Sequence, residues 1–203
     1  KDQMAWTYPA KVAETCSRCH GNAEYMKEYK IPTDQFEKYK QSIHYEMLTK
    51  RGDLASPTCS SCHGSHGATP PGIDSVANVC SHCHVVTAEL FAESAHEPAF
   101  AELGMPACVT CHGNHDVMKP SDAMLTGGEG TPCATCHEAN SVPLNKAAQL
   151  RTMVEGLSSQ IDRATAILTR AEHAGMEIGA PRFELLAAKE SLIKARTETH
   201  SLK

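Results

Sequence analysis

Every cysteine in this chain of 203 residues belongs to one short pattern. The pattern is Cys-x-x-Cys-His, and it occurs five times; we number the copies motifs 1 to 5 in chain order. The cysteine pairs are Cys16 and Cys19, Cys59 and Cys62, Cys80 and Cys83, Cys108 and Cys111, and Cys133 and Cys136, and the histidines that follow them are His20, His63, His84, His112 and His137. Two thiols at this spacing form thioethers to the vinyl groups of a porphyrin, and the adjacent imidazole ligates the iron. The sequence therefore predicts five covalently bound c-type haems.

Other uses of paired cysteines explain the pattern less well. A structural zinc site takes four ligands, often from two Cys-x-x-Cys pairs, and gives no reason for a histidine after every second cysteine. Five pairs would also leave one pair without a partner. A disulfide framework tolerates varied spacings and does not require the histidines. Haem attachment accounts for the spacing and for the histidines together.

The composition fits a fold in which porphyrins supply much of the core. Aromatic residues make up only 5% of the chain, and large aliphatic residues are sparse before residue 140. A polypeptide so poor in apolar side chains has difficulty in building a core of its own. We therefore expect the haems to form the core of the first two thirds of the chain, and that part to be largely unfolded without them.

The charge balance bears on the partners. The formal net charge is −5, and the haem propionates would make the assembled molecule more acidic. This argues against nucleic acid and favours redox proteins with a basic docking surface. The sequence has no apolar run long enough to span a membrane and no charged-then-apolar leader. Because attachment of haem in this way is completed outside the cytoplasm, we expect a periplasmic or extracellular location, with a signal or anchor that is not in this chain.

Motifs 2 to 5 lie in an internal repeat. The first unit has Ser-x-His at 42–44, Cys-x-x-Cys-His-Gly-x-His at 59–66 and Cys-x-x-Cys-His at 80–84. The second unit has the same three patterns at 94–96, 108–115 and 133–137. Motif 1 precedes the first unit, where we expect it to correspond to the last motif of a unit whose front half is missing.

The sequence predicts a mainly α-helical fold with extensive loops, in two domains. The first is a pentahaem domain at 1–142, where frequent prolines and glycines favour short helices, for example at 35–50 and 87–103. The second is at 143–203, where apolar residues recur at helical spacing in two stretches separated by Gly175 and Gly179. Two such stretches joined by a short turn predict an antiparallel helical hairpin.

Seven histidines lie outside the motifs, and bis-histidine ligation of every haem needs five of them as distal ligands. Four occupy matching positions in the two repeat units, and matching positions suggest matching roles. These predicted distal ligands are His44, His96, His66 and His115.

The fifth distal ligand is predicted from helix length. A helix over 145–173 rises roughly 40 Å, so His173 would lie far from motif 5, whereas a returning helix brings His200 back towards it. We therefore expect His200 to ligate haem 5. His82 lies between two thioether cysteines and would have to fold back over its own ring, so we do not expect it to be a ligand. Methionine is a possible axial ligand, but it more commonly packs against a porphyrin face.

These motifs resemble those of multihaem cytochromes c of the cytochrome c3-like and NapC/NirT/NrfH-like groups, over about residues 12 to 140. The resemblance implies that the His of Ser-x-His and the second His of His-Gly-x-His are distal ligands, usually to a neighbouring haem. It also implies an electron-transfer role. The N-terminal membrane anchor of the quinol-oxidising members and the Cys-x-x-Cys-Lys motif of nitrite-reducing relatives do not occur in this sequence.

The sequence therefore predicts an electron-transfer protein that relays electrons through five, mostly bis-histidine, haems, and not an enzyme. Six-coordinate iron has no vacant site for a substrate. Two alternatives stay open: a reductase with one open haem, or a subunit of a cytochrome filament or complex in which the hairpin is an assembly surface.

Overall fold

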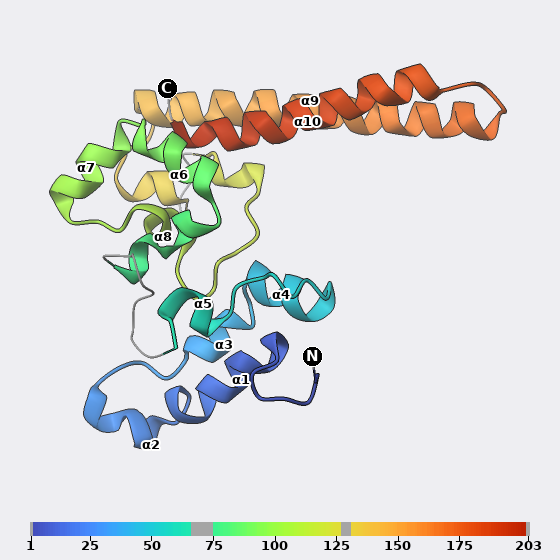
Figure 1. Cartoon of the computed structure of the whole chain (residues 1–203). Helices are drawn as coiled ribbons and strands as arrows, with labels where there is room; N and C mark the ends of the chain where they lie inside the picture. Colours follow the sequence, from blue (N-terminus) through green and yellow to red (C-terminus); the bar gives the residue numbers. More distant parts are fainter. Residues whose placement is uncertain (1, 66–74, 127–130, 202–203) are drawn as a thin grey trace. The chain divides into compact units, whose positions relative to one another are not determined.

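A computed structural model describes residues 2–65, 75–126 and 131–201 (Figure 1). These residues form helices and loops, with no β-strand among them, which confirms the predicted mainly α-helical fold with extensive loops. Within the described residues, no helix combines the length and the apolar character that crossing a bilayer requires.

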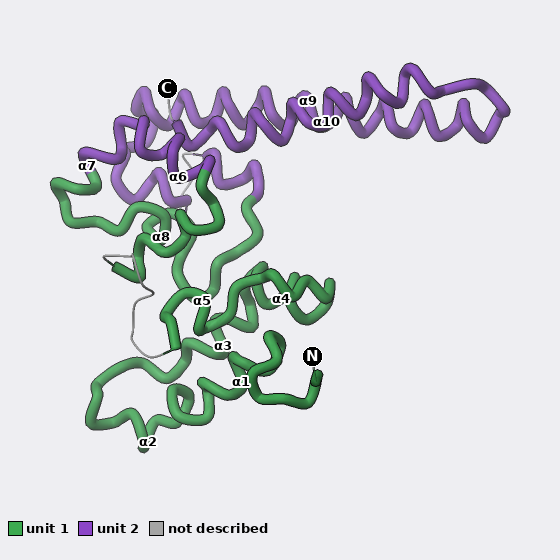
Figure 2. The backbone as a smooth tube through the Cα atoms, in the orientation of Figure 1, with its two compact units in different colours: residues 1–85, 100–120 green, residues 86–99, 121–203 purple. Residues whose placement is uncertain are grey.

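The chain forms two compact units (Figure 2). Unit 1 comprises Lys1–Val85 and Phe100–Pro120, and unit 2 comprises Val86–Ala99 and Ser121–Lys203. The units therefore divide the chain at other positions than the expected domain boundary after residue 142. Motif 5 and the second Ser-x-His belong to the same unit as the C-terminal helices.

Unit 1 is built from short elements. They are α1 (Pro9–His20), α2 (Ala23–Met26), η1 (Lys27–Tyr29), α3 (Gln35–Tyr39), α4 (Ile43–Lys50), α5 (Cys59–His63), η2 (Val76–His82) and α8 (Ala107–His112), where η denotes a 3₁₀ helix. Helices α6 (Val85–Ala92) and α7 (His96–Leu103) each contain residues of both units. The other elements of unit 2 are η3 (Asp122–Met124), η4 (Pro132–Thr135), α9 (Val142–His173), α10 (Gly179–Glu198) and η5 (Thr199–Ser201).

The two helices expected at 35–50 and 87–103 are each broken into two, and both breaks lie at the serine of Ser-x-His. Ser42 is the N-cap of α4, where its hydroxyl accepts a hydrogen bond from the backbone N–H of Tyr45 at 3.1 Å. Ser94 lies just before α7, and its hydroxyl accepts from the N–H of His96 at 3.2 Å. A serine hydroxyl that accepts from a backbone N–H at the start of a helix favours the start of a new helix at that point. The serine thereby places the histidine of the motif in the first turn of that helix.

The predicted C-terminal hairpin is confirmed. Helices α9 and α10 pack antiparallel around Val154, Ile161 and Leu192, each only 6% exposed. Gly175, with φ +79°, adopts the left-handed conformation that ends α9. Across the turn, Arg182 forms an ion pair with Glu172 at 2.6 Å.

Unit 1 has a much thinner apolar core. Its buried apolar side chains are Ala13, Met26, Tyr39, Leu48 and Phe100. Each comes from a different helix, so no element contributes a continuous apolar face. Among the described residues, no large side chain is less than 2% exposed.

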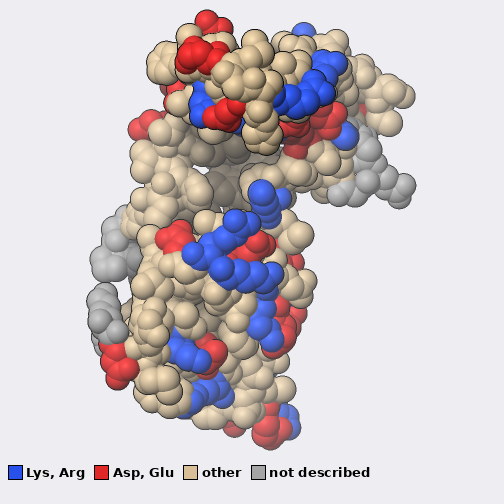
Figure 3. Space-filling model, turned by 90° about the vertical axis from the view of Figure 1, so that its right-hand side faces the viewer, with Lys and Arg blue, Asp and Glu red and all other residues tan. Residues whose placement is uncertain are grey.

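The surface carries both signs of charge. On the face drawn in Figure 3, acidic and basic side chains lie close together in several places, and one larger group of basic side chains is visible. Many of the ion pairs join residues three or four apart in the chain, such as Lys11 with Glu14 of α1 at 3.0 Å. Exposed pairs of this kind contribute little to folding stability.

Candidate metal centres

The attachment motifs adopt two conformations. Motifs 1, 2 and 4 lie at the C-terminal ends of α1, α5 and α8, and each of these helices ends at the histidine of its motif. Motifs 3 and 5 lie on 3₁₀ turns, where the N–H of His84 donates to the carbonyl of Cys80 at 2.9 Å and that of His137 to Cys133 at 3.0 Å. Motif 1 therefore has the conformation of the first motif of a repeat unit, not of the last motif to which we had compared it.

A glycine with an unusual backbone follows motifs 2 and 4. Gly64 has φ 74° and ψ −177°, and Gly113 has φ 72° and ψ −175°. This region is essentially restricted to glycine because a Cβ would clash there. The glycine of Cys-x-x-Cys-His-Gly-x-His is thus required for the chain reversal after the helix.

The main feature of the site is that three imidazole pairs face each other. His44 faces His84, with ring centres 6.4 Å apart, and His63 faces His115 at 6.0 Å. His96 faces His137 at 5.9 Å. Each pair joins one motif histidine to one histidine that the sequence predicted as a distal ligand.

These separations fit an iron atom held between two imidazoles. A metal–nitrogen distance of roughly 2 Å on each side, plus roughly 1 Å from nitrogen to ring centre, puts the ring centres roughly 6 Å apart. The angle between the rings varies from 17° to 88° while their separation stays between 5.9 and 6.4 Å. Ligation by both rings would allow such a range of angles, since an imidazole can turn about a metal–nitrogen bond.

The donor set also fits a porphyrin better than a metal held by protein ligands alone. A pair of imidazoles supplies two ligands, whereas a structural zinc site needs four. No group of three or more His, Cys, Asp or Glu side chains in the described parts of the chain is arranged to bind a metal ion. A porphyrin supplies the four equatorial nitrogens that an imidazole pair lacks.

The pairs follow the internal repeat. In each repeat, the His of Ser-x-His faces the histidine of the last motif of the same repeat. His44 faces His84 in the first repeat, and His96 faces His137 in the second. His115 of the second repeat instead faces His63 of the first repeat, and both histidines belong to unit 1. His96 therefore occupies the position opposite motif 5 for which the sequence had led us to expect His200.

The three histidines that the sequence predicted as distal ligands and that face a motif histidine are shifted towards the neutral form, which is the form that binds metal. Burial lowers the pKa of His44 and of His96, and the facing His84 or His137 lowers it further. Burial also lowers the pKa of His115, with a further contribution from His63.

Contacts between separate segments of unit 1 position the residues next to His44 and His115. The N–H of Ile43, next to His44, donates to the carbonyl of Val117 at 2.9 Å. This bond joins the start of α4 to the segment that follows His115. The Tyr39 ring packs edge-on against Tyr45 of α4, and its hydroxyl donates to the carbonyl of Pro57, just before motif 2, at 2.7 Å.

The attachment elements of motifs 1 to 4 contact each other in chain order. Helix α1 packs against α5, α5 against η2, and η2 against α8. The thiols of neighbouring motifs come together at these contacts. Burial raises the pKa of Cys59, and the nearby Cys16 thiol raises it further. The nearby Cys108 thiol lowers the pKa of Cys80.

The other candidate ligands are placed as follows. His66 lies outside the described residues. His200 lies in η5, where its Nδ1 is 2.9 Å from the carbonyl oxygen of Thr197. A proton on Nδ1 satisfies this bond and leaves the lone pair on Nε2, as in a ligand imidazole. His173 and His82 are exposed, at the ends of α9 and η2.

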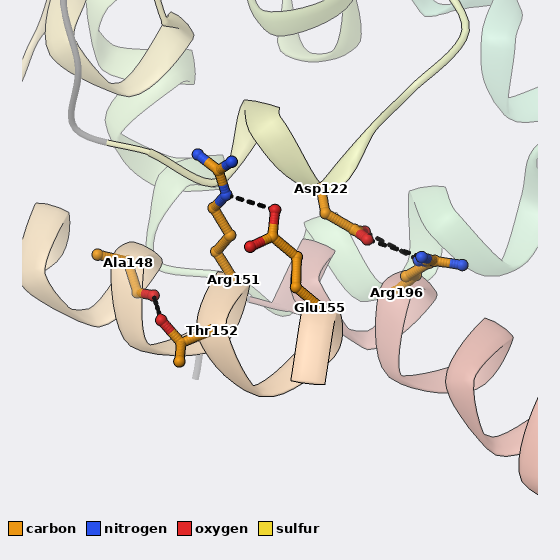
Figure 4. Close-up of polar contacts among 6 residues, drawn as sticks. All are labelled: Asp122, Ala148, Arg151, Thr152, Glu155 and Arg196. Atoms are coloured by element: carbon orange, nitrogen blue, oxygen red, sulfur yellow. Dashed lines mark hydrogen bonds and ion pairs between the residues drawn. The ribbon is translucent and has the colours of Figure 1, made fainter. Parts of the chain in front are cut away.

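The segment that carries His200 is tied to the rest of unit 2 by an ion pair that the sequence did not predict. Arg196 of α10 binds Asp122 of η3 through two bonds, Nε to Oδ1 at 2.8 Å and Nη2 to Oδ2 at 2.6 Å (Figure 4). On α9, Arg151 forms an ion pair with Glu155 at 2.7 Å. Nothing in the sequence pattern marks Asp122 and Arg196 as partners, because they are far apart in the chain. Ser42 did carry a signal, as a helix N-cap.

Comparison of the chain with protein-family models, with curated proteins and with solved structures gave no match.

Proposed function

We propose that this chain is a pentahaem c-type cytochrome that relays electrons between redox partners. The observation that carries the proposal is the three facing imidazole pairs, each made of one Cys-x-x-Cys-His histidine and one histidine from elsewhere in the chain. When bound, haem c supplies a one-electron iron couple.

The histidine pairs favour electron transfer over catalysis. Two histidines would hold each of these haem irons, and an iron held by both would have no open position for a substrate. Histidine on both sides, without methionine, also favours a low reduction potential.

The packing of the attachment elements supports a relay. In unit 1 the contacts α1–α5, α5–η2 and η2–α8 hold motifs 1 to 4 in a continuous series. In two of these contacts a thiol of one motif shifts the pKa of a thiol of the next, Cys16 that of Cys59 and Cys80 that of Cys108. The chain therefore holds consecutive sites close together, as stepwise transfer requires.

The remaining ligands are proposed by counting. His44, His115 and His96 face motifs 3, 2 and 5. His66 and His200 are the other two proposed distal histidines. The Nδ1 contact of His200 with Thr197 supports this role, since it orients the ring and directs the lone pair to Nε2.

The location and the partners are proposed on chemical grounds. Thioether attachment of haem is completed outside the cytoplasm, so we propose a periplasmic or extracellular protein. The net charge of −5 favours a partner with a basic docking surface. One partner would donate electrons and another accept them.

A reductive titration of the purified, coloured protein tests the proposed function. We expect five electron equivalents per chain, low-spin spectra throughout, and no binding of carbon monoxide to the reduced protein. A variant with Cys133→Ser and Cys136→Ser, which removes one attachment site, should take up four equivalents. A high-spin haem that binds carbon monoxide would favour a reductase with an open site instead.

A further inference from the structure

We propose that the haem between His96 and His137 is electronically distinct from the haem between His63 and His115, because the ligand planes are crossed in the first and parallel in the second. The interplanar angle is 88° for His96 and His137 and 17° for His63 and His115. This inference rests on the proposed function, since it concerns how this chain's histidines orient on a bound iron.

The electronic difference follows from orbital overlap. Each imidazole has a filled π orbital perpendicular to its ring, which overlaps with one of two d orbitals of a low-spin ferric iron. Two parallel rings both raise the energy of the same d orbital, so the energies of the two d orbitals become widely different. Crossed rings raise the energies of the two d orbitals almost equally, so these energies stay nearly the same. The magnetic anisotropy of the iron is then large. The third pair, His44 and His84 at 39°, is intermediate.

The start of the helix accounts for the different orientation of two histidines that occupy the same motif. In the first repeat, the hydroxyl of Ser42 accepts a hydrogen bond from the backbone N–H of Tyr45, and His44 is the second residue of α4. In the second repeat, the hydroxyl of Ser94 accepts a hydrogen bond from the backbone N–H of His96 itself, and His96 is the first residue of α7. A helix turns by 100° per residue, so a shift of one residue in its start rotates the histidine relative to the helix axis. Ser94 is 4% exposed, and its hydroxyl therefore has little access to water as an alternative partner.

Electron paramagnetic resonance of the fully oxidised holoprotein tests the assignment. We expect at least two low-spin signals: a strongly anisotropic one from the haem of motif 5 and a rhombic one from the haem of motif 2. The variant His96→Ala should lose the anisotropic signal and gain a high-spin one, with the rhombic signal unchanged. The matched variant His115→Ala should lose the rhombic signal and gain a high-spin one, with the anisotropic signal unchanged. An anisotropic signal that survives His96→Ala, or its absence from the native spectrum, would overturn the proposal.

A milder pair of variants keeps every ligand. Ser94→Ala removes the hydroxyl that accepts from His96, and we expect the anisotropic signal to shift towards the rhombic form with all five haems retained. Ser42→Ala is the control and should leave that signal unchanged. An unchanged signal in Ser94→Ala would overturn the role given to Ser94.

The haem content separates failure of this inference from failure of the proposed function. Five covalent haems with only rhombic signals would overturn the crossed-plane assignment and leave the cytochrome intact. A protein without covalent haem would overturn both.

Discussion

The C-terminal hairpin and unit 1 are built on different principles. The hairpin has a continuous apolar seam, with Val154, Ile161 and Leu192 buried against each other. Unit 1 has isolated buried side chains on separate helices, and its most regular long-range features are histidine pairs and adjacent thiols. The comparison teaches that the hairpin has an apolar core of its own, whereas the described part of unit 1 has only isolated buried apolar side chains. Under the proposed function, unit 1 would mainly supply ligands and attachment points.

The largest effect should come from withholding haem. Without it, we expect unit 1 to lose its fixed tertiary structure, because its own buried apolar surface is too small to offset chain entropy. The hairpin should stay helical. Hydrogen exchange measured by mass spectrometry would show fast exchange over residues 2–65 and slow exchange in α9 and α10. Equal protection in the two regions would contradict the comparison.

Truncating the hairpin seam should have the next largest effect. Leu192→Ala is expected to destabilise the hairpin by about 2–5 kcal/mol, because it leaves a cavity where the side chain was buried. The neighbouring Ile193 is 62% exposed, so Ile193→Ala is a matched control and should change stability by less than about 0.5 kcal/mol. Chemical denaturation followed by circular dichroism measures both. Similar losses in the two variants would show that the seam does not stabilise the hairpin.

A smaller effect is expected at the glycine after motif 4. Gly113→Ala forces a Cβ into a glycine-only conformation, with Asp116 Oδ1 only 3.2 Å from it, and should cost about 1–3 kcal/mol. It should also displace His115 and give a partly high-spin haem, which an absorption spectrum detects.

Gly156→Ala is the control for this substitution. Gly156 lies inside α9, and a Cβ added there would meet no atom of another described segment within 4 Å, so the change should stabilise the helix by about 0.5–1 kcal/mol. A fully low-spin Gly113→Ala protein of native stability would contradict the role given to Gly113.

The smallest effect concerns the ion pair between Asp122 and Arg196. The hydrogen bond from Arg196 lowers the pKa of Asp122, so the pair stabilises the fold above the ordinary pKa of an aspartate, near 4, and this contribution is lost as the pH falls through the lowered pKa. We expect about 0.2–1 kcal/mol, because Arg196 is partly exposed. Unfolding of the native protein and of Asp122→Asn, measured from pH 7 down to pH 3, should converge at the acidic end. A constant difference across this range would contradict the assignment.

The sequence predicted the local patterns well and the long-range ones in part. Apolar periodicity predicted the hairpin, because helix packing follows directly from it. Matching repeat positions selected His44, His96 and His115, which the structure brings to motif histidines. The sequence led us to expect His200 opposite His137, where the structure has His96. Helix length alone cannot say which of two nearby segments reaches a site. The breaks at Ser42 and Ser94 were missed because a capping hydrogen bond overrode the helical pattern.

The mass of the denatured protein tests the central claim most directly. Thioether bonds survive denaturation, whereas haem held only by ligation is released. The account predicts a mass greater than that of the 21.9 kDa polypeptide by five haem groups. The mass of the bare polypeptide would contradict it.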